Sequence, residues 1–105
     1  MSKAAVHRAT LRVPASHPAL PGHFPGRPIV PGVVLLQSVL DEAERWLGRE
    51  LSPRALPQAK FSAPLLPEQD AKLELRLAGN ELRFSVTRAG QTVTQGLLAL
   101  AGPAA

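Results

Sequence analysis

The sequence contains no cysteine among its 105 residues. Disulfide bonds, thiolate metal sites and a cysteine nucleophile are therefore excluded. No apolar run approaches the roughly 18 residues that a membrane-spanning helix needs, and the N-terminal stretch MSKAAVHRAT lacks the apolar segment of a signal peptide. We therefore expect a cytoplasmic protein that does not associate with membranes.

Runs of lysine or arginine are also absent, although the formal net charge is +4 and the pI is about 10.7. The basic residues are scattered along the chain, and aromatic residues make up only 4% of it. Because few side chains could stack on bases, the composition does not favour a nucleic-acid-binding protein. The positive charge indicates either a solvated surface or one that attracts an acidic partner by long-range steering.

The apolar fraction of 45% is that of an ordinary globular chain. The length predicts a single domain over residues 1–105, close to the lower limit for a self-sufficient hydrophobic core. Small domains often gain stability by association, so a homodimer or a higher homo-oligomer is expected.

The first half of the chain predicts a strand, a stiff loop and one helix. Polar and apolar residues alternate over residues 6–13, which is typical of a half-buried strand. A proline-dense segment over 16–31 should form a rigid irregular cover. Helical spacing of apolar residues follows over 32–47, with Pro31 suited to the first turn and Gly48 to a C-cap. The charges come late in this helix, so its N-terminal half should be the buried half.

The second half predicts an antiparallel meander. Apolar and polar side chains alternate over 71–77 and over 82–86, and a last strand is expected over 92–101. Turn signals at Gly79-Asn80 and Ala89-Gly90 separate these segments. A shorter strand is expected over 58–63, after a connection over 51–57. One buried helix with a curled antiparallel sheet makes an α+β domain.

The segment over 21–37 has the sequence PGHFPGRPIVPGVVLLQ. It places His23 in a loop stiffened by glycine and proline, and it opens the apolar helix with Pro31 and Gly32. This order closely resembles the signature of the 3-hydroxyacyl-[acyl carrier protein] dehydratases of the hotdog superfamily. In that signature a His-Phe-Pro-Gly loop and a Pro-x-x-Pro-Gly-Val turn precede an acidic residue on the helix. The segment KFSAPLLPEQDAKLELRL continues the resemblance with lower specificity, so that it covers residues 6–101.

The resemblance implies the hotdog fold, a long central helix wrapped by a curved antiparallel sheet. It also implies dehydration of 3-hydroxyacyl thioesters, carried by acyl carrier protein or coenzyme A, to trans-2-enoyl thioesters in fatty acid or polyketide-type synthesis. His23 matches the catalytic histidine, and histidine is the side chain suited to act as a base near neutral pH. Backbone N–H groups at the start of the helix would polarise the thioester. The expected substrate-binding residues are Phe24, Pro31, Gly32, Val33 and Leu36.

Gln37 occupies the position where the family carries Glu or Asp. A primary amide can hydrogen-bond the leaving hydroxyl, yet it cannot deliver a proton at neutral pH. Three interpretations follow. The chain could be a slow dehydratase in which His23 also returns the proton, a non-catalytic thioester-binding or heterodimer subunit beside an active homologue, or a hotdog thioesterase in which Gln37 positions water. The family builds each site from two subunits of a dimer, which the resemblance implies here too.

The remaining histidines have structural interpretations. His7 belongs to the first predicted strand, and we interpret it as structural. His17 precedes His23 by six residues, which could suggest a metal pair. Without cysteine or a helical pair of histidines we predict no metal site, and no cofactor is expected.

The other notable side chains are acids and aromatics near the helix and the following strand. Asp41 lies one turn after the glutamine, and we interpret it as a solvated charge. Glu42 and Glu44 are expected to be surface charges. Phe61 and Trp46 are most simply core residues.

Overall fold

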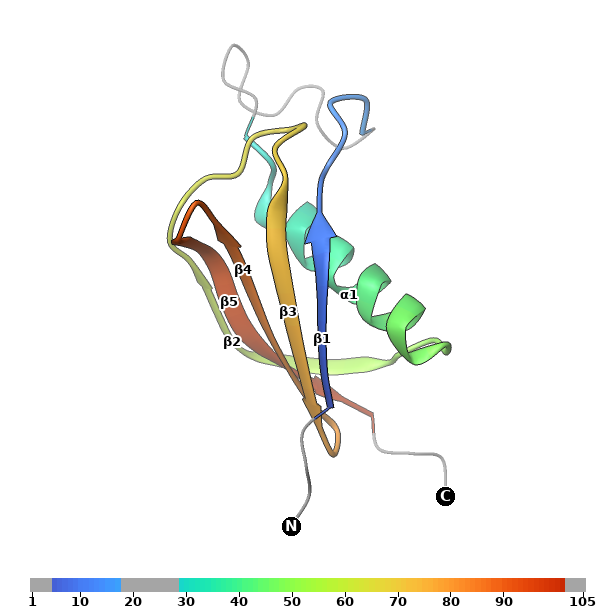
Figure 1. The fold of residues 1–105 in the computed structure, drawn as a ribbon. Helices are drawn as coiled ribbons and strands as arrows, with labels where there is room; N and C mark the ends of the chain where they lie inside the picture. The colour runs from blue at the N-terminus through green and yellow to red at the C-terminus, as the bar shows by residue number, and fades with distance from the viewer. Residues whose placement is uncertain (1–4, 18–28, 102–105) are drawn as a thin grey trace.

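The computed structural model describes residues 5–17 and 29–101. The elements in chain order are β1 (Ala5–Leu11), α1 (Gly32–Leu47), β2 (Pro53–Phe61), β3 (Ala71–Ala78), β4 (Glu81–Arg88) and β5 (Gln91–Leu100). Figure 1 shows the strands curving as one sheet with α1 lying against one of its faces. The predicted α+β class is therefore confirmed, and α1 has the predicted bounds.

The sheet has five antiparallel strands in the order β1-β3-β4-β5-β2. The predicted meander is confirmed, because β3, β4 and β5 pair consecutively through two-residue turns. The turns place Gly79 (φ 61°), Ala89 (φ 51°) and Gly90 (φ 77°) in the left-handed region, which matches the right-handed twist of the flanking strands. This topology leaves β1 and β2 at the two edges of the sheet.

The bounds of β2 differ from the prediction. A connection was expected over 51–57 and a strand over 58–63, whereas the strand runs from Pro53 to Phe61. Prolines are tolerated here because β2 pairs only with β5, so a missing N–H costs a hydrogen bond on one side at most. Irregularities in the register fall between Pro53 and Ala55 and between Ala55 and Gln58, where Pro57 lies.

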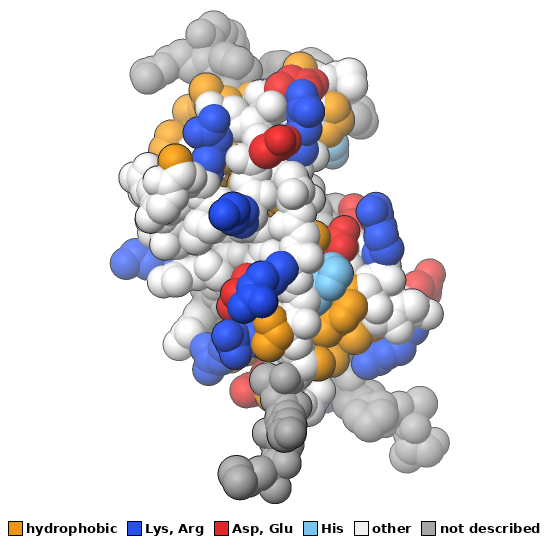
Figure 2. All heavy atoms as spheres, viewed as in Figure 1, with side chains coloured by type: hydrophobic (Ala, Val, Ile, Leu, Met, Phe, Trp, Pro, Cys, Tyr) orange, Lys and Arg blue, Asp and Glu red, His pale blue; other side chains and the backbone are white. Residues whose placement is uncertain are grey.

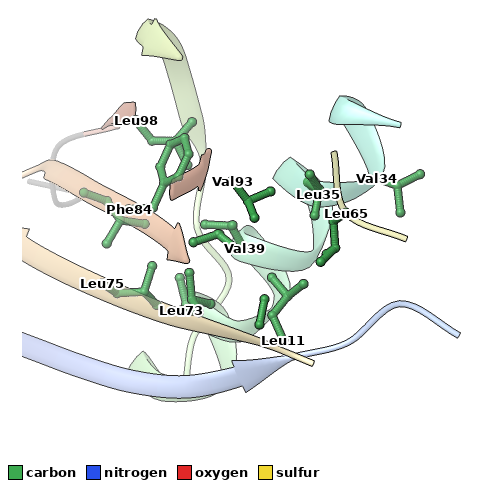
Figure 3. Close-up of a cluster of buried hydrophobic side chains, with 14 of the residues drawn as sticks. Leu11, Val34, Leu35, Val39, Leu65, Leu73, Leu75, Phe84, Val93 and Leu98 are labelled. Carbon is green, nitrogen blue, oxygen red and sulfur yellow. The ribbon is translucent and has the colours of Figure 1, made fainter. Parts of the chain in front are cut away.

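The hydrophobic core lies between α1 and the inner face of the sheet (Figure 3). The helix contributes Val34, Leu35, Val39 and Ala43, all of them buried. From Leu35 onward these positions are four residues apart, so the buried stripe continues to Ala43 in the C-terminal half of the helix. The prediction that only the N-terminal half is buried is therefore wrong. Val33, one position from the stripe, has 73% of its surface exposed. The sheet contributes buried residues such as Leu73, Leu75, Leu82, Phe84 and Val86.

A polar cluster fastens the C-terminal half of α1 to β1. The Nε2 atom of His7 lies 2.8 Å from Oε2 of Glu42, and the His7 ring stacks on Trp46 with a centroid distance of 5.2 Å. Glu44 accepts a hydrogen bond from the Leu51 backbone N–H at 2.8 Å. The expectation of ordinary surface charges is therefore wrong for both glutamates, because each one joins α1 to a segment that packs beside it.

Candidate active site

The N-terminus of α1 has no side-chain cap from the described residues. Pro31 is its N-cap, with no side-chain cap and no acidic residue in the first turn. The Val34 and Leu35 N–H groups both donate to the Pro31 carbonyl, at 3.0 and 3.1 Å. Within the described part of the chain, the N–H groups of Gly32 and Val33 have no acceptor. Two donors and the positive end of the helix dipole are therefore available to an anionic or strongly polarised oxygen.

A groove of about 410 Å³ lies beside this helix end. Its lining is mainly apolar and includes Ile29, Gly32, Leu35, Phe61, Ala63 and Leu65. The walls come from segments far apart in the sequence, and one backbone hydrogen bond joins them, from the Val30 N–H to the Leu65 carbonyl at 2.8 Å. The groove therefore offers an apolar chain a place to lie at the helix end whose first two N–H groups have no acceptor among the described residues.

Phe61 covers Gly32. A Cβ atom built on Gly32 would lie 2.9 Å from Cζ and 3.0 Å from Cε1 of the Phe61 ring, so a glycine is required for the ring to lie there. Phe61 is nevertheless 49% exposed, and the prediction that it belongs to the core is wrong. The physical reason is its place at the end of an edge strand, where neighbours cover the ring on one side only.

Gln37 lies on the exposed side of α1. Its Nε2 group donates to Oδ1 of Asp41 at 2.8 Å, one turn further along the helix. In the described residues Oε1 of Gln37 has no hydrogen-bond partner, so it is free to accept a proton donor from a ligand. Asp41 is exposed as expected, and it also fixes the orientation of the glutamine amide.

The opposite, outer face of the sheet collects basic side chains (Figure 2). A second groove of about 660 Å³ crosses this face, and its lining includes Lys60, Arg76 and Arg83. The main acid there is Glu74, which binds Arg8 at 3.0 Å and Arg76 at 3.1 Å. The hydrogen bond from Arg76, followed by that from Arg8, holds the pKa of Glu74 below its usual value. Glu74 is thus already engaged, and the face stays positive.

A model of the ApeI-like family, described as ApeI dehydratase, matches residues 2–97 of this sequence. The chain belongs to the ApeI-like dehydratase family. This membership agrees with the family that the His-Phe-Pro-Gly segment resembled, and it extends over almost the whole chain.

Distant relatives of this ApeI-like chain are 3-hydroxyacyl-[acyl-carrier-protein] dehydratases named FabZ. The protein of Herpetosiphon aurantiacus is 27% identical over 97 residues, an alignment that covers 86% of this chain and 69% of the relative. The protein of Klebsiella pneumoniae is 30% identical over 105 residues, covering 90% and 64%. The one from Legionella pneumophila strain Corby covers 60% and 49% at 30% identity. The chain thus spans about half to two thirds of the length of these relatives.

Solved structures confirm the hotdog fold of this ApeI-like chain. The dehydratase heterocomplex ApeI:P from Xenorhabdus doucetiae superposes with a TM-score of 0.78 at 25% identity, covering 96% of this chain and 98% of that one. An uncharacterized protein from Erwinia carotovora superposes with a TM-score of 0.80 at 24% identity, covering 98% and 88%, and supports the fold alone.

The predicted site residues fall into three groups. His23 and Phe24 lie outside the described residues. Pro31 and Gly32 line the apolar groove. Outside the groove's lining are Val33, which is exposed, Leu36, which packs half-buried against the core, and Gln37, which is exposed on α1.

Sequence reasoning missed the contribution of Phe61 to the groove. The contact joins the end of β2 to the start of α1, and no periodicity within either segment encodes it.

Two further observations concern metals and membranes. Across 5–17 and 29–101, His, Asp and Glu nowhere gather in a group of three or more that could hold a metal ion. In the same residues no helix is long and apolar enough to cross a membrane.

Proposed function

We propose that this chain removes water from 3-hydroxyacyl thioesters carried by acyl carrier protein, giving trans-2-enoyl thioesters, and that it does so slowly because Gln37 replaces the usual acid. One observation carries the proposal: an apolar groove lies at the start of α1, where the N–H groups of Gly32 and Val33 have no acceptor among the described residues. Family membership and the His23 motif support the same chemistry.

The reaction has two steps, abstraction of a proton from C2 and departure of the hydroxyl group from C3. His23 takes the proton from C2, and the negative charge passes to the thioester oxygen, where the N–H groups of Gly32 and Val33 would stabilise it. The C3–O bond then breaks. The hydroxide that leaves takes up the proton held by His23, so that one water forms and the base is regenerated.

Gln37 would assist the departure of the 3-hydroxyl group without supplying a proton to it. It lies roughly 7.5 Å along the helix from Gly32, at 1.5 Å per residue. Its free Oε1 can accept the hydrogen of the 3-hydroxyl group, while Asp41 holds the Nε2 side. This arrangement orients the hydroxyl but leaves protonation to His23 alone, and the absence of a positioned acid typically costs about 10²–10⁴-fold in rate.

The variant Gln37→Glu should therefore accelerate dehydration by roughly 10-fold or more. The introduced carboxyl would lie one turn from Asp41, and repulsion between neighbouring carboxylates favours keeping one of them protonated, which is the form that an acid catalyst needs. The measurement is mass spectrometry of a 3-hydroxyacyl carrier protein thioester, following the loss of one water over time.

Two control variants accompany this assay. Gln37→Met keeps the size of the side chain and should not accelerate the reaction, and His23→Ala should abolish it. Release of the free acid in place of the enoyl thioester would establish a thioesterase instead. Turnover that persists in His23→Ala would contradict the proposed base.

A non-catalytic role within a heterodimer is the second candidate, and a specific observation favours it. The acid position is already a glutamine, and β2 offers an edge that no described strand covers. Co-expression with a homologue that carries Glu at this position would distinguish the two roles. If activity needs the homologue's Glu and survives His23→Ala in this chain, this chain is the supporting subunit.

A further inference from the structure

The ring of Phe61 narrows the groove at the start of α1. It presses against the only position in the first turn of the helix that has no side chain, Gly32. On the same wall, Ser62 and Ala63 have small side chains. Phe61 is therefore the largest side chain on this wall, and its position determines how wide an entering ligand can be.

The backbone around Phe61 is fixed, so the ring can move only through its side-chain torsions. The Lys60 carbonyl accepts a hydrogen bond from Oγ1 of the fully buried Thr94 at 2.8 Å. On the other side, the Ser62 N–H donates to the Val93 carbonyl at 2.9 Å. Strand β5 thus anchors both flanks of Phe61, while half of the side chain faces solvent.

We propose that Phe61 is a specificity-determining residue, whose ring limits the width of the acyl group that can lie against the start of α1. A straight acyl chain passes along the ring face, whereas a branched or aryl group near the thioester must displace the ring into solvent. The inference rests on the proposed function, because it assumes that the groove holds the acyl thioester.

The test compares binding of two non-reactive probes, 3-hydroxyacyl pantetheine amides with a straight and with a branched acyl group. Removing the ring in Phe61→Ala should shift the ratio of the two dissociation constants by about tenfold or more toward the branched probe, the scale on which apolar pockets discriminate size. Phe61→Leu should give an intermediate ratio. Val6→Ala is the matched control, since Val6 is similarly exposed (38%) on the strand at the opposite edge of the sheet, and its ratio should not change.

A second variant distinguishes an effect of the Phe61 ring on the width of the groove from a general effect on packing. Gly32→Ala places a methyl group where the ring lies, so it should alter the ratio in the wild-type background and have a much smaller effect in the Phe61→Ala background. If Phe61→Ala weakens both probes equally, or leaves the ratio unchanged, the ring has only a packing role and the inference is overturned. Failure of the wild type to bind either probe would instead overturn the proposed function.

Discussion

Single side chains in this molecule matter most where they join segments that the sequence separates widely. Glu68 is an example. Its carboxylate accepts hydrogen bonds from the Ala15 N–H at 2.8 Å and from Arg12 at 2.6 Å, and its own N–H donates to the Val13 carbonyl. The turn before β3 is thereby tied to the segment after β1. The bond from Ala15, followed by that from Arg12, lowers the pKa of Glu68.

The lowered pKa predicts how stability depends on acidity. The folded state favours the carboxylate, so the contribution of Glu68 is present above the ordinary pKa of 4.5 and is lost as the pH falls through the lower folded value. Glu68→Gln should reduce the melting temperature at neutral pH, and the difference from wild type should shrink in acid. Glu81→Gln is the control, because Glu81 has no ion pair with any described residue. If the difference in melting temperature between wild type and Glu68→Gln stayed constant down to about pH 3, this role of Glu68 would be contradicted.

The His7 contact with Glu42 gives a second prediction at this scale. The Glu42 side chain is only 18% exposed, so removing its charge should cost about 1 kcal/mol of unfolding free energy. Glu42→Gln can be measured by urea unfolding with the fluorescence of Trp46, the only tryptophan. Arg45→Gln should change stability by a few tenths of a kcal/mol at most, because Arg45 is 80% exposed and 3.7 Å from Glu42. Equal effects of the two substitutions would show that burial confers no advantage here.

At the scale of elements, sequence patterns predicted those helices and strands whose bounds depend on residues within or next to the element. The bounds of α1 follow from Pro31 and Gly48 at its ends. Pro31 is the N-cap, where the N–H that proline lacks would have no partner in the helix, and Gly48 adopts φ 70° with its N–H bonded to the Glu44 carbonyl. Strict alternation predicted β3 and β4, and the turn at Ala89-Gly90 marked the start of β5. The pattern failed for β2, where prolines suggested a loop, because whether a strand lies at an edge depends on the whole topology.

The same limit applies to the candidate site. The proline-glycine pair predicted the helix end that the structure has, and Gln37 could be placed on the following turns from helical spacing. The ring over Gly32 could not be predicted, because it depends on how β2 curves back to the start of α1. Contacts between elements follow from topology, and the sequence specifies them only through the entire fold.

Substitution by alanine should reduce the free energy of unfolding by very different amounts at two glycines, Gly48 and Gly96. Gly48 has open space around its Cβ position, so Gly48→Ala should cost only backbone strain, about 1 kcal/mol. In β5, a Cβ on Gly96 would lie next to the Gln58 carbonyl of β2 and 2.6 Å from the Phe84 ring. Gly96→Ala should therefore cost well over 2 kcal/mol, because backbone and core must both move. Denaturant unfolding compares the two variants, and similar losses would mean that β2 yields more easily than its pairing indicates.

For the whole molecule, the side of the sheet that carries β2 is the natural place for a second subunit. Every residue of β2 is exposed, Leu56 and Phe61 among them, and long exposed edges tend to pair. We expect a dimer in solution, with two sites that each draw on both subunits. Leu56→Asp should shift the sedimentation profile toward monomer and reduce any dehydratase activity in parallel. A wild-type chain that sediments as a monomer at high concentration would contradict this arrangement.

The basic outer face of the sheet gives the molecule an uneven distribution of charge in space. Cations crowd that face, while Asp41, Glu42 and Glu44 lie on the helix that packs against the other side. Such a separation amounts to an electric dipole that runs through the thickness of the domain. A negatively charged macromolecule would exert a torque on this dipole before any contact forms. The protein would therefore rotate until the basic face of its sheet points toward the approaching macromolecule. The two molecules would then collide in a narrow range of orientations.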